Sequence, residues 1–219
     1  MQEKIDKLYC GRFSTGDLEK KNRLWKLLCR EFFQKYIAAD AAVLDIGAGY
    51  CEFINNIKAG AKYAVDLNPD TPRFAAPDVK VFIADATKLD FLEENIIDIA
   101  FMSNFLEHLN TKFEVLAVLK SVLRILKPGG KVLILQCNVR YAYKQYWDFF
   151  DHNIPLTDKS LAEALELAGF KINKIYPRFL PYTTKSRLPW NDWLVKAYLR
   201  IPLAWKILGA QAFIVGEKA

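Results

Sequence analysis

The sequence has few of the residues that build metal centres and disulfide frameworks. Its 219 residues include four cysteines and two histidines, and the cysteines stand far apart, at positions 10, 29, 51 and 137, with no C-x-x-C pair. Metal sites and disulfide frameworks are recognised by short, repeated spacings of these residues. The spacing therefore predicts reduced thiols and no bound metal.

Long apolar runs, internal repeats and low-complexity segments are also missing. A membrane-spanning helix needs about 18 or more consecutive apolar residues, and no run approaches that length. The start, MQEKIDKLYCGRF, carries acids and lacks an apolar stretch, so we expect no signal peptide and a cytoplasmic protein. The net charge of +6 is mild and favours a solvated basic surface over a nucleic-acid partner.

What is present is typical of one globular domain spanning 1–219, with 52% apolar and 14% aromatic residues. Apolar periodicity predicts a helix over 17–37, and short apolar strands then alternate with helices. The expected strands are 43–46, 62–66, 79–84, 96–102, 131–137, 171–176 and 211–216. We expect further helices from a capping box at Thr111–Glu114 to the stop at Lys127-Pro128, and over 158–168. This α/β alternation predicts a doubly wound, mostly parallel sheet.

The first strand-to-helix turn reads VLDIGAGYCEF, from Val43 to Phe53. Gly47 and Gly49 allow a sharp turn and a close approach of the backbone to a ligand. Asp66 ends the second strand, where a carboxylate can accept both ribose hydroxyls. A dinucleotide loop would have a third glycine where Glu52 stands, and Asp45 precedes the loop. These two acids repel a pyrophosphate and favour a cationic nucleoside.

These residues resemble the class I S-adenosylmethionine (SAM)-dependent methyltransferases, in the small-molecule group with a D-x-G-x-G loop. The resemblance covers about 43–137 through five motifs in order: VLDIGAG, AVDLNPD, FIADA, IIDIAFMSNFLEHL and LRILKPGGKVLIL. It implies a Rossmann-like fold with an antiparallel C-terminal edge strand, and SAM as cofactor. It places the following residues at the cofactor: Asp45, Gly47, Ala48, Gly49, Asp66, Leu67, Asp85, Ala86, Ser103 and Asn104.

Several of these residues also have structural interpretations. Asp45 is suited to a helix N-terminus, Asp66 to a strand-end turn, Asp85 to a solvated loop, and Ser103 with Asn104 to capping a short helix. Cys51 is small and we expect it to be tolerated. An N-terminal arm (1–40), with Tyr9 and Arg12, either folds over the cofactor or frays.

The acceptor side is predicted from 138–219. The Ser-Asn-Phe-Leu sequence at 103–106 has none of the prolines that DNA base-amine methyltransferases carry there, so we expect no nucleic-acid acceptor. A hydroxyl acceptor needs a general base, and His152 is the candidate, unless it is a structural loop histidine. His108 is expected to be packed. Segments after the fifth strand resemble those of methyltransferases of glycan assembly, which favours a sugar or glycolipid-linked acceptor and O-methylation.

The insertion between the last two strands, 178–209, is expected to form a helical cap. Its basic, Trp-rich part, 181–208, is either an amphipathic lid on the core or a surface for anionic membrane or a lipid-linked acceptor. We expect Asp192, Lys196 and Arg200 to form a polar stripe, with Trp193, Ala197 and Ile201 filling another face. Two alternatives to a methyltransferase stay open: a non-catalytic SAM-binding protein and an NAD(P)-dependent oxidoreductase.

Overall fold

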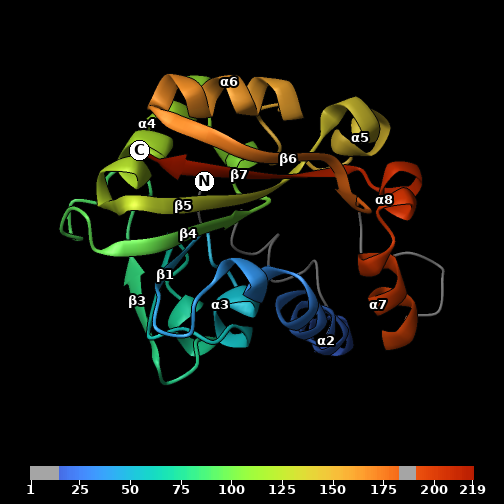
Figure 1. Cartoon of the computed structure of the whole chain (residues 1–219), viewed down its shortest axis with the longest axis horizontal. Helices are drawn as coiled ribbons and strands as arrows, with labels where there is room; N and C mark the ends of the chain where they lie inside the picture. The colour runs from blue at the N-terminus through green and yellow to red at the C-terminus, as the bar shows by residue number, and fades with distance from the viewer. Residues whose placement is uncertain (1–14, 183–190) are drawn as a thin grey trace.

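The computed structural model describes residues 15–182 and 191–219. Figure 1 shows a central sheet between two layers of helices. The sheet has seven strands in the order β3-β2-β1-β4-β5-β7-β6. Their bounds are β1 Ala42–Ile46, β2 Ala61–Asp66, β3 Val79–Ile83, β4 Ile97–Ser103, β5 Leu126–Cys137, β6 Phe170–Leu180 and β7 Gln211–Lys218.

The first five strands in the chain are parallel, and β7 is antiparallel to both of its neighbours, β5 and β6. The predicted Rossmann-like, mostly parallel fold is therefore confirmed. The antiparallel strand β7 lies one place in from the edge, because β6 pairs outside it. The single-domain organisation over 1–219 stays a prediction.

Helices cover both faces of the sheet (Figure 1). The helices are α2 Thr15–Glu31, α3 Glu52–Asn56, α4 Lys112–Ile125, α5 Val139–Tyr146, α6 Asp158–Ala168, α7 Asp192–Arg200 and α8 Pro202–Leu208. Among the described residues there are also three short 3₁₀ turns: η1 Phe33–Tyr36, η2 Thr71–Arg73 and η3 Leu106–His108.

Alternation along the strands divides the core into two halves. In β5, Val132 and Ile134 pack with α4 and α6, while Leu133 and Leu135 pack with α2, α3, α7 and α8. Successive side chains of a strand point to opposite faces, so a strand buried on both sides reads as a continuous apolar run. This is why the central strands could be recognised from apolar runs alone.

The predicted helix over 17–37 is wrong at its end. The α-helix stops at Glu31, Phe32 has non-helical angles (φ −130°, ψ −61°), and the chain continues as η1. Phe32 and Phe33 are both buried, with Phe32 packed on Phe179 (ring centroids 4.2 Å apart) and Phe33 on Phe101 (5.2 Å). Adjacent residues of a continuous helix point about 100° apart, and the break allows both rings to enter one cluster.

The prediction around α4 needs two corrections. Thr111 caps the helix by accepting from the Glu114 amide, but the Glu114 carboxylate accepts from Asn110, so the reciprocal bond of a capping box is missing. The helix ends at Ile125 and β5 begins at once, with the Lys127–Gly130 stretch bulged against β4. A Cβ at Gly130 would lie 2.8 Å from the Lys127 carbonyl oxygen, which explains the glycine.

The predicted helical cap is confirmed over the described residues as α7 and α8, although β6 runs on to Leu180. Trp190, Lys185 and Arg187 lie outside the described residues, as do Tyr9 and Arg12. The face with Trp193 and Ile201 is turned outward, since these residues are 69% and 50% exposed, while Leu199 and Trp205 are buried. In the part of the chain that the structure describes, no helix combines the length and apolarity needed to cross a membrane.

Candidate active site

The loop between β1 and α3 lies at the carboxyl end of β1, an inner strand of the sheet, where α/β sheets bind ligands. Its backbone is pinned to β2, because the Gly47 and Ala48 amides both donate to the Val65 carbonyl, at 2.9 and 3.3 Å. Gly49 and Cys51 also have positive φ, 50° and 58°. The predicted glycine turn is therefore present, with Cys51 in a conformation that favours glycine.

Gly47 is the residue that the turn needs most. Its φ is +68°, and a Cβ there would lie 2.5 Å from the Phe105 ring. Phe105 follows the end of β4 after one intervening residue, Asn104. Its ring therefore covers the cofactor loop from the neighbouring strand. This contact joins the loop to the segment that carries Glu107 and His108.

Asp66 meets the loop directly. One carboxylate oxygen accepts from the Gly49 amide at 2.7 Å, and the other accepts from the Asn68 amide at 2.8 Å. The strand-end turn interpretation of Asp66 is thus supported, and its contact with the ribose hydroxyls stays a prediction. A carboxylate has about four acceptor positions, so each oxygen keeps capacity for a ribose hydroxyl.

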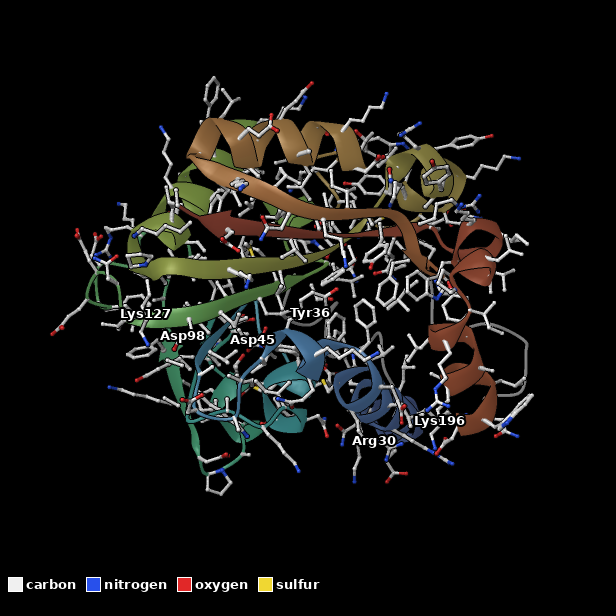
Figure 2. The ribbon with its side chains drawn as sticks, in the orientation of Figure 1. Arg30, Tyr36, Asp45, Asp98, Lys127 and Lys196 are labelled. Carbon is white, nitrogen blue, oxygen red and sulfur yellow. The ribbon has the colours of Figure 1, made fainter. Side chains whose placement is uncertain are left out.

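Three acids, Asp45, Glu52 and Asp66, lie at or beside the loop. Asp45 is 4% exposed and shares the face of β1 that α2 and α3 cover (Figure 2). Burial raises the pKa of its carboxyl well above the usual value, and the charges of Glu52 and Asp66 add to the shift. Glu52 pairs with Lys21 at 2.9 Å. Acids at this loop disfavour a phosphate and can accept hydrogen bonds from an ammonium, so the residues present fit SAM.

Asp45 also contacts α3, because its carboxyl group accepts a hydrogen bond from the Ile54 backbone amide. This hydrogen bond lowers the pKa of Asp45 and offsets part of the rise. Cys51 is fully buried, and its thiol points to the Thr71 carbonyl at 3.9 Å. Burial, with the charge of Asp45 as the next cause, raises the pKa of the Cys51 thiol to about 12. The thiol is therefore protonated and inert at neutral pH.

The third-strand residues reach the same edge. The Ala84 amide donates to the Asp66 carbonyl at 3.1 Å, and Asp85 follows at once. Asp85 is exposed and accepts from the Thr87 amide at 2.8 Å, which matches the loop-acid interpretation and leaves its second oxygen to solvent. Ala86 is buried and Leu67 is 60% exposed. Leu67 thus offers an apolar surface beside Asp66.

Asn104 does not cap the following 3₁₀ turn, as one interpretation required. Its side chain accepts from the Cys137 amide at 3.1 Å and donates to Gln211 at 3.1 Å, and its own amide donates to the Leu135 carbonyl at 2.8 Å. It therefore ties together the ends of β4, β5 and β7. Ser103 ends β4 beside it, half-buried.

The acceptor side holds a cluster of Glu107, His108 and His152, whose ligand-type atoms all lie within 4.8 Å of one another. The expectation from spacing that no such group exists is corrected, because the loop after α5 folds back on η3 through two amides donating to the Glu107 carbonyl. The His152 Nδ1 lies 2.9 Å from the Tyr146 carbonyl, and the His108 Nδ1 lies 3.0 Å from the Asp151 carbonyl.

Those carbonyls define the chemistry of both rings. A carbonyl only accepts, so the Nδ1 of each ring carries a proton. The His108 Nδ1 also lies 3.3 Å from an Asp151 carboxylate oxygen. Burial lowers the pKa of His152, and His108 reinforces the shift against the opposing charge of Glu107. His152 is therefore neutral and basic at Nε2 near neutral pH. The packed interpretation of His108 is also supported.

Sequence reasoning missed two supports of this cluster. Gln136 donates to the buried Glu107 carboxylate at 2.6 Å, and the Tyr146 ring lies 4.7 Å from the His152 ring. Tyr146 is fully buried and its hydroxyl donates to the Ile154 carbonyl. The available signal was Gln136 itself, a polar residue inside the apolar run of the fifth predicted strand.

A hollow of about 310 Å³ lies elsewhere, at the amino ends of the strands. Tyr36, Asp98 and Lys127 line it. Asp98 and Lys127 lie at the left in Figure 2, away from α5 and α8, which Figure 1 labels at the right. The Lys127 ammonium pairs with Asp98 at 2.8 Å, and Asp98 also accepts from the Ala42 amide. These polar groups satisfy one another, so we assign this hollow no part in the active site.

Several solved structures that superimpose on this chain are described as methyltransferases. A SAM-dependent methyltransferase from Archaeoglobus fulgidus superimposes with a TM-score of 0.68 at 22% identity, over 90% of this chain and 94% of that one. A geranyl diphosphate methyltransferase solved with SAM gives 0.65 at 14% identity, over 93% and 88%. At these identities the likeness shows the fold.

The sequence comparisons define the class. A family model described as a methyltransferase domain matches residues 18–175. The chain belongs to this methyltransferase family, and the predicted class, the SAM-dependent methyltransferases, is confirmed. The ubiquinone/menaquinone biosynthesis C-methyltransferase UbiE of Idiomarina loihiensis is 37% identical over 79 residues, which cover 35% of this chain and 30% of that relative. The oxidoreductase and non-catalytic alternatives are not supported.

Proposed function

We propose that this methyltransferase methylates a hydroxyl group of a small molecule, a sugar or glycolipid-linked metabolite, and that His152 removes the hydroxyl proton. The observation that carries the proposal is the Nδ1 contact of His152 with the Tyr146 carbonyl at 2.9 Å. It fixes the proton on Nδ1 and leaves Nε2 as an acceptor. A neutral, oriented imidazole is what general-base chemistry at neutral pH needs.

Asp45, Gly47, Gly49 and Asp66 would hold the cofactor, with Leu67, Asp85 and Ala86 next to them on the second and third strands. When bound, SAM supplies an electrophilic methyl group on a sulfonium. The chain contributes alignment and a dry environment, which can account for about 7–11 kcal/mol of the barrier. The Phe105 ring lies against Gly47 of the loop, and Glu107 and His108 follow it two and three residues later, so the loop and the histidine cluster lie at one edge of the sheet.

The surroundings of His152 favour a hydroxyl acceptor. The Tyr146 and Phe149 rings lie 4.7 and 5.0 Å from the imidazole and cover part of its surface. An amine acceptor needs only to be neutral and has no use for such a base. A carbon acceptor does need a base to remove its proton. The partial match to a C-methyltransferase therefore makes a phenol or quinol the second class of acceptor to test.

The test is turnover of radiolabelled SAM against free sugars, lipid-linked sugars, phenols and amines, followed by His152→Ala with the best acceptor. We expect kcat to fall by about 10²–10⁴, the affinity for SAM to stay unchanged, and activity to recover partly at high pH. Lys159→Ala, an exposed change on α6, is the control. Nearly full turnover in His152→Ala would overturn the assignment of the base, and methylation of amines alone would overturn O-methylation.

A further inference from the structure

The two helices of the cap expose an apolar surface at one edge of the molecule, at the right in Figure 1. It consists of six large side chains that are 47–69% exposed, which we call the cap surface: Trp193, Leu194, Ile201, Leu203, Ile207 and Leu208. Single exposed apolar residues are ordinary, but a group of them on one short segment marks an interaction site.

The inward faces of these helices are already used for folding. Leu199 and Trp205 are buried in the core with Phe32 and Phe179, and the Trp205 indole donates to the Tyr198 carbonyl at 2.7 Å. In α8, Leu203, Lys206 and Ile207 follow at i, i+3 and i+4 and make the outward face. The exposed residues are therefore presented by a fixed scaffold.

Cations accompany the apolar residues. From Asn191 to Leu208 the sequence has Lys196, Arg200 and Lys206 against one acid, Asp192. That acid pairs with Arg23 of α2 at 2.8 Å. Arg200 is 74% exposed and contacts Glu31 only at 3.4 Å, and Lys196 lies at the same edge as Arg30 (Figure 2). The cap surface thus combines apolar side chains with excess positive charge.

The cap surface also borders the acceptor side. Arg178 donates to the carbonyls of Ile207 and Gly209, at 2.6 and 2.7 Å, and its guanidinium lies 4.7 Å from the Tyr141 ring of α5. The chain leaving α8 enters β7 at Gln211, which pairs with Cys137 and bonds to Asn104. The end of α8 is therefore next to the ends of β4 and β5.

We propose that the cap surface docks on an anionic phospholipid bilayer. Amphipathic helices bind such interfaces by burying Trp and Leu side chains while Lys and Arg meet the lipid phosphates. Pairing with a second copy of the chain is the less suited occupant, because two-fold symmetry would bring the same Lys and Arg side chains together without acids to match them. The docking goes beyond the proposed function and does not depend on the identity of the acceptor.

The experiment is co-sedimentation of the full chain with vesicles of phosphatidylcholine and phosphatidylglycerol in equal amounts, and with phosphatidylcholine alone. We expect binding to the mixed vesicles that weakens with added salt, and little binding to phosphatidylcholine. Leu203→Ser/Ile207→Ser should lower the partition coefficient by at least about tenfold, and Arg200→Gln/Lys206→Gln should remove the salt dependence. Leu167→Ser, an equally exposed leucine on α6 (73%), should bind as the parent does.

Several results would overturn the docking. They are absence of binding to the mixed vesicles, equal loss in the Leu167→Ser control, and a dimer by sedimentation equilibrium that the Leu203→Ser/Ile207→Ser variant abolishes. SAM affinity, measured on every variant, reports the fold of the cofactor site and separates a failure of docking from a failure of the proposed function.

Discussion

The Asp66 carboxylate accepts a hydrogen bond from the Gly49 amide at 2.7 Å. This contact joins the carboxylate that ends β2 to the glycine turn that follows β1. It fixes the orientation of the acid before any ligand binds. Preorganised acceptors of this kind save the cost of ordering a side chain on binding.

Asp66→Asn should therefore weaken SAM binding. The variant loses the charge, and its amide nitrogen would face the donor of either Gly49 or Asn68. Hydrogen bonds to charged groups contribute about 1.5–3 kcal/mol, so the dissociation constant should rise about ten- to hundredfold. Calorimetry with SAM measures it. Asp70→Asn, an acid in the same turn that pairs with Arg73, is the matched control, and equal affinities in both variants would contradict the role of Asp66.

Asp45→Asn should separate stability from binding. The pKa of Asp45 is higher in the folded protein than in the unfolded chain. At pH values above the usual pKa of Asp, the folded state therefore binds more protons than the unfolded state. The free energy of unfolding of the parent then falls as the pH rises through that window. The Asn variant lacks this fall, and its Asn side chain can still accept from the Ile54 amide.

We expect the Tm difference between Asp45→Asn and the parent to grow from pH 4 to neutral pH, where each kcal/mol corresponds to about 2–4 °C for a chain of this size. SAM affinity should fall in the same variant. A Tm difference independent of pH would show that Asp45 is not the titrating group.

The two glycines of the loop should respond differently to alanine. Both have positive φ, which costs an L-residue about 1–2 kcal/mol. At Gly47 the new methyl group would also meet the Phe105 ring at 2.5 Å, whereas at Gly49 nothing lies within 4 Å. Urea unfolding should show Gly47→Ala to be clearly the less stable variant. Equal losses would mean that Phe105 moves aside without cost.

Much of the cofactor site was predictable because its signals are local. Gly47, Gly49 and Asp66 follow strand ends within short motifs, and the carboxyl ends of parallel strands converge at one edge. The strands could also be predicted from a local signal. Burial on both faces makes each strand a continuous apolar run, as around Leu133 and Leu135.

The rest depended on contacts between distant segments. Asn104 bonds to Cys137 and Gln211, and no local pattern specifies those partners. His108 and His152 meet only because the loop after α5 folds onto η3. In α7, the spacing of Trp193, Ala197 and Ile201 described a helix face correctly, but the position of α2 decides which face is buried.

The Cys51 thiol should be unreactive toward alkylating reagents in the folded protein. Because the pKa of its buried thiol is about 12, the folded protein should leave Cys51 unmodified by iodoacetamide at pH 8, and the unfolded protein should be labelled there. Peptide mass spectrometry distinguishes the two. Cys51→Gly suits the positive φ at this position and should leave SAM affinity unchanged. A large gain in affinity would show that the cysteine narrows the site.

Turnover should survive removal of divalent metals. Glu107, His108 and His152 are ligand types for a cation, and their atoms lie within 4.8 Å of one another. A base, however, needs the same Nε2 lone pair of His152 that a metal would occupy. If His152 acts as the base, dialysis against EDTA should leave kcat unchanged, and added Mg²⁺ or Zn²⁺ should not raise it. If activity is lost on dialysis and a divalent ion restores it, the cluster is a metal centre and His152 is not the base, since one lone pair cannot both bind a metal and accept a proton.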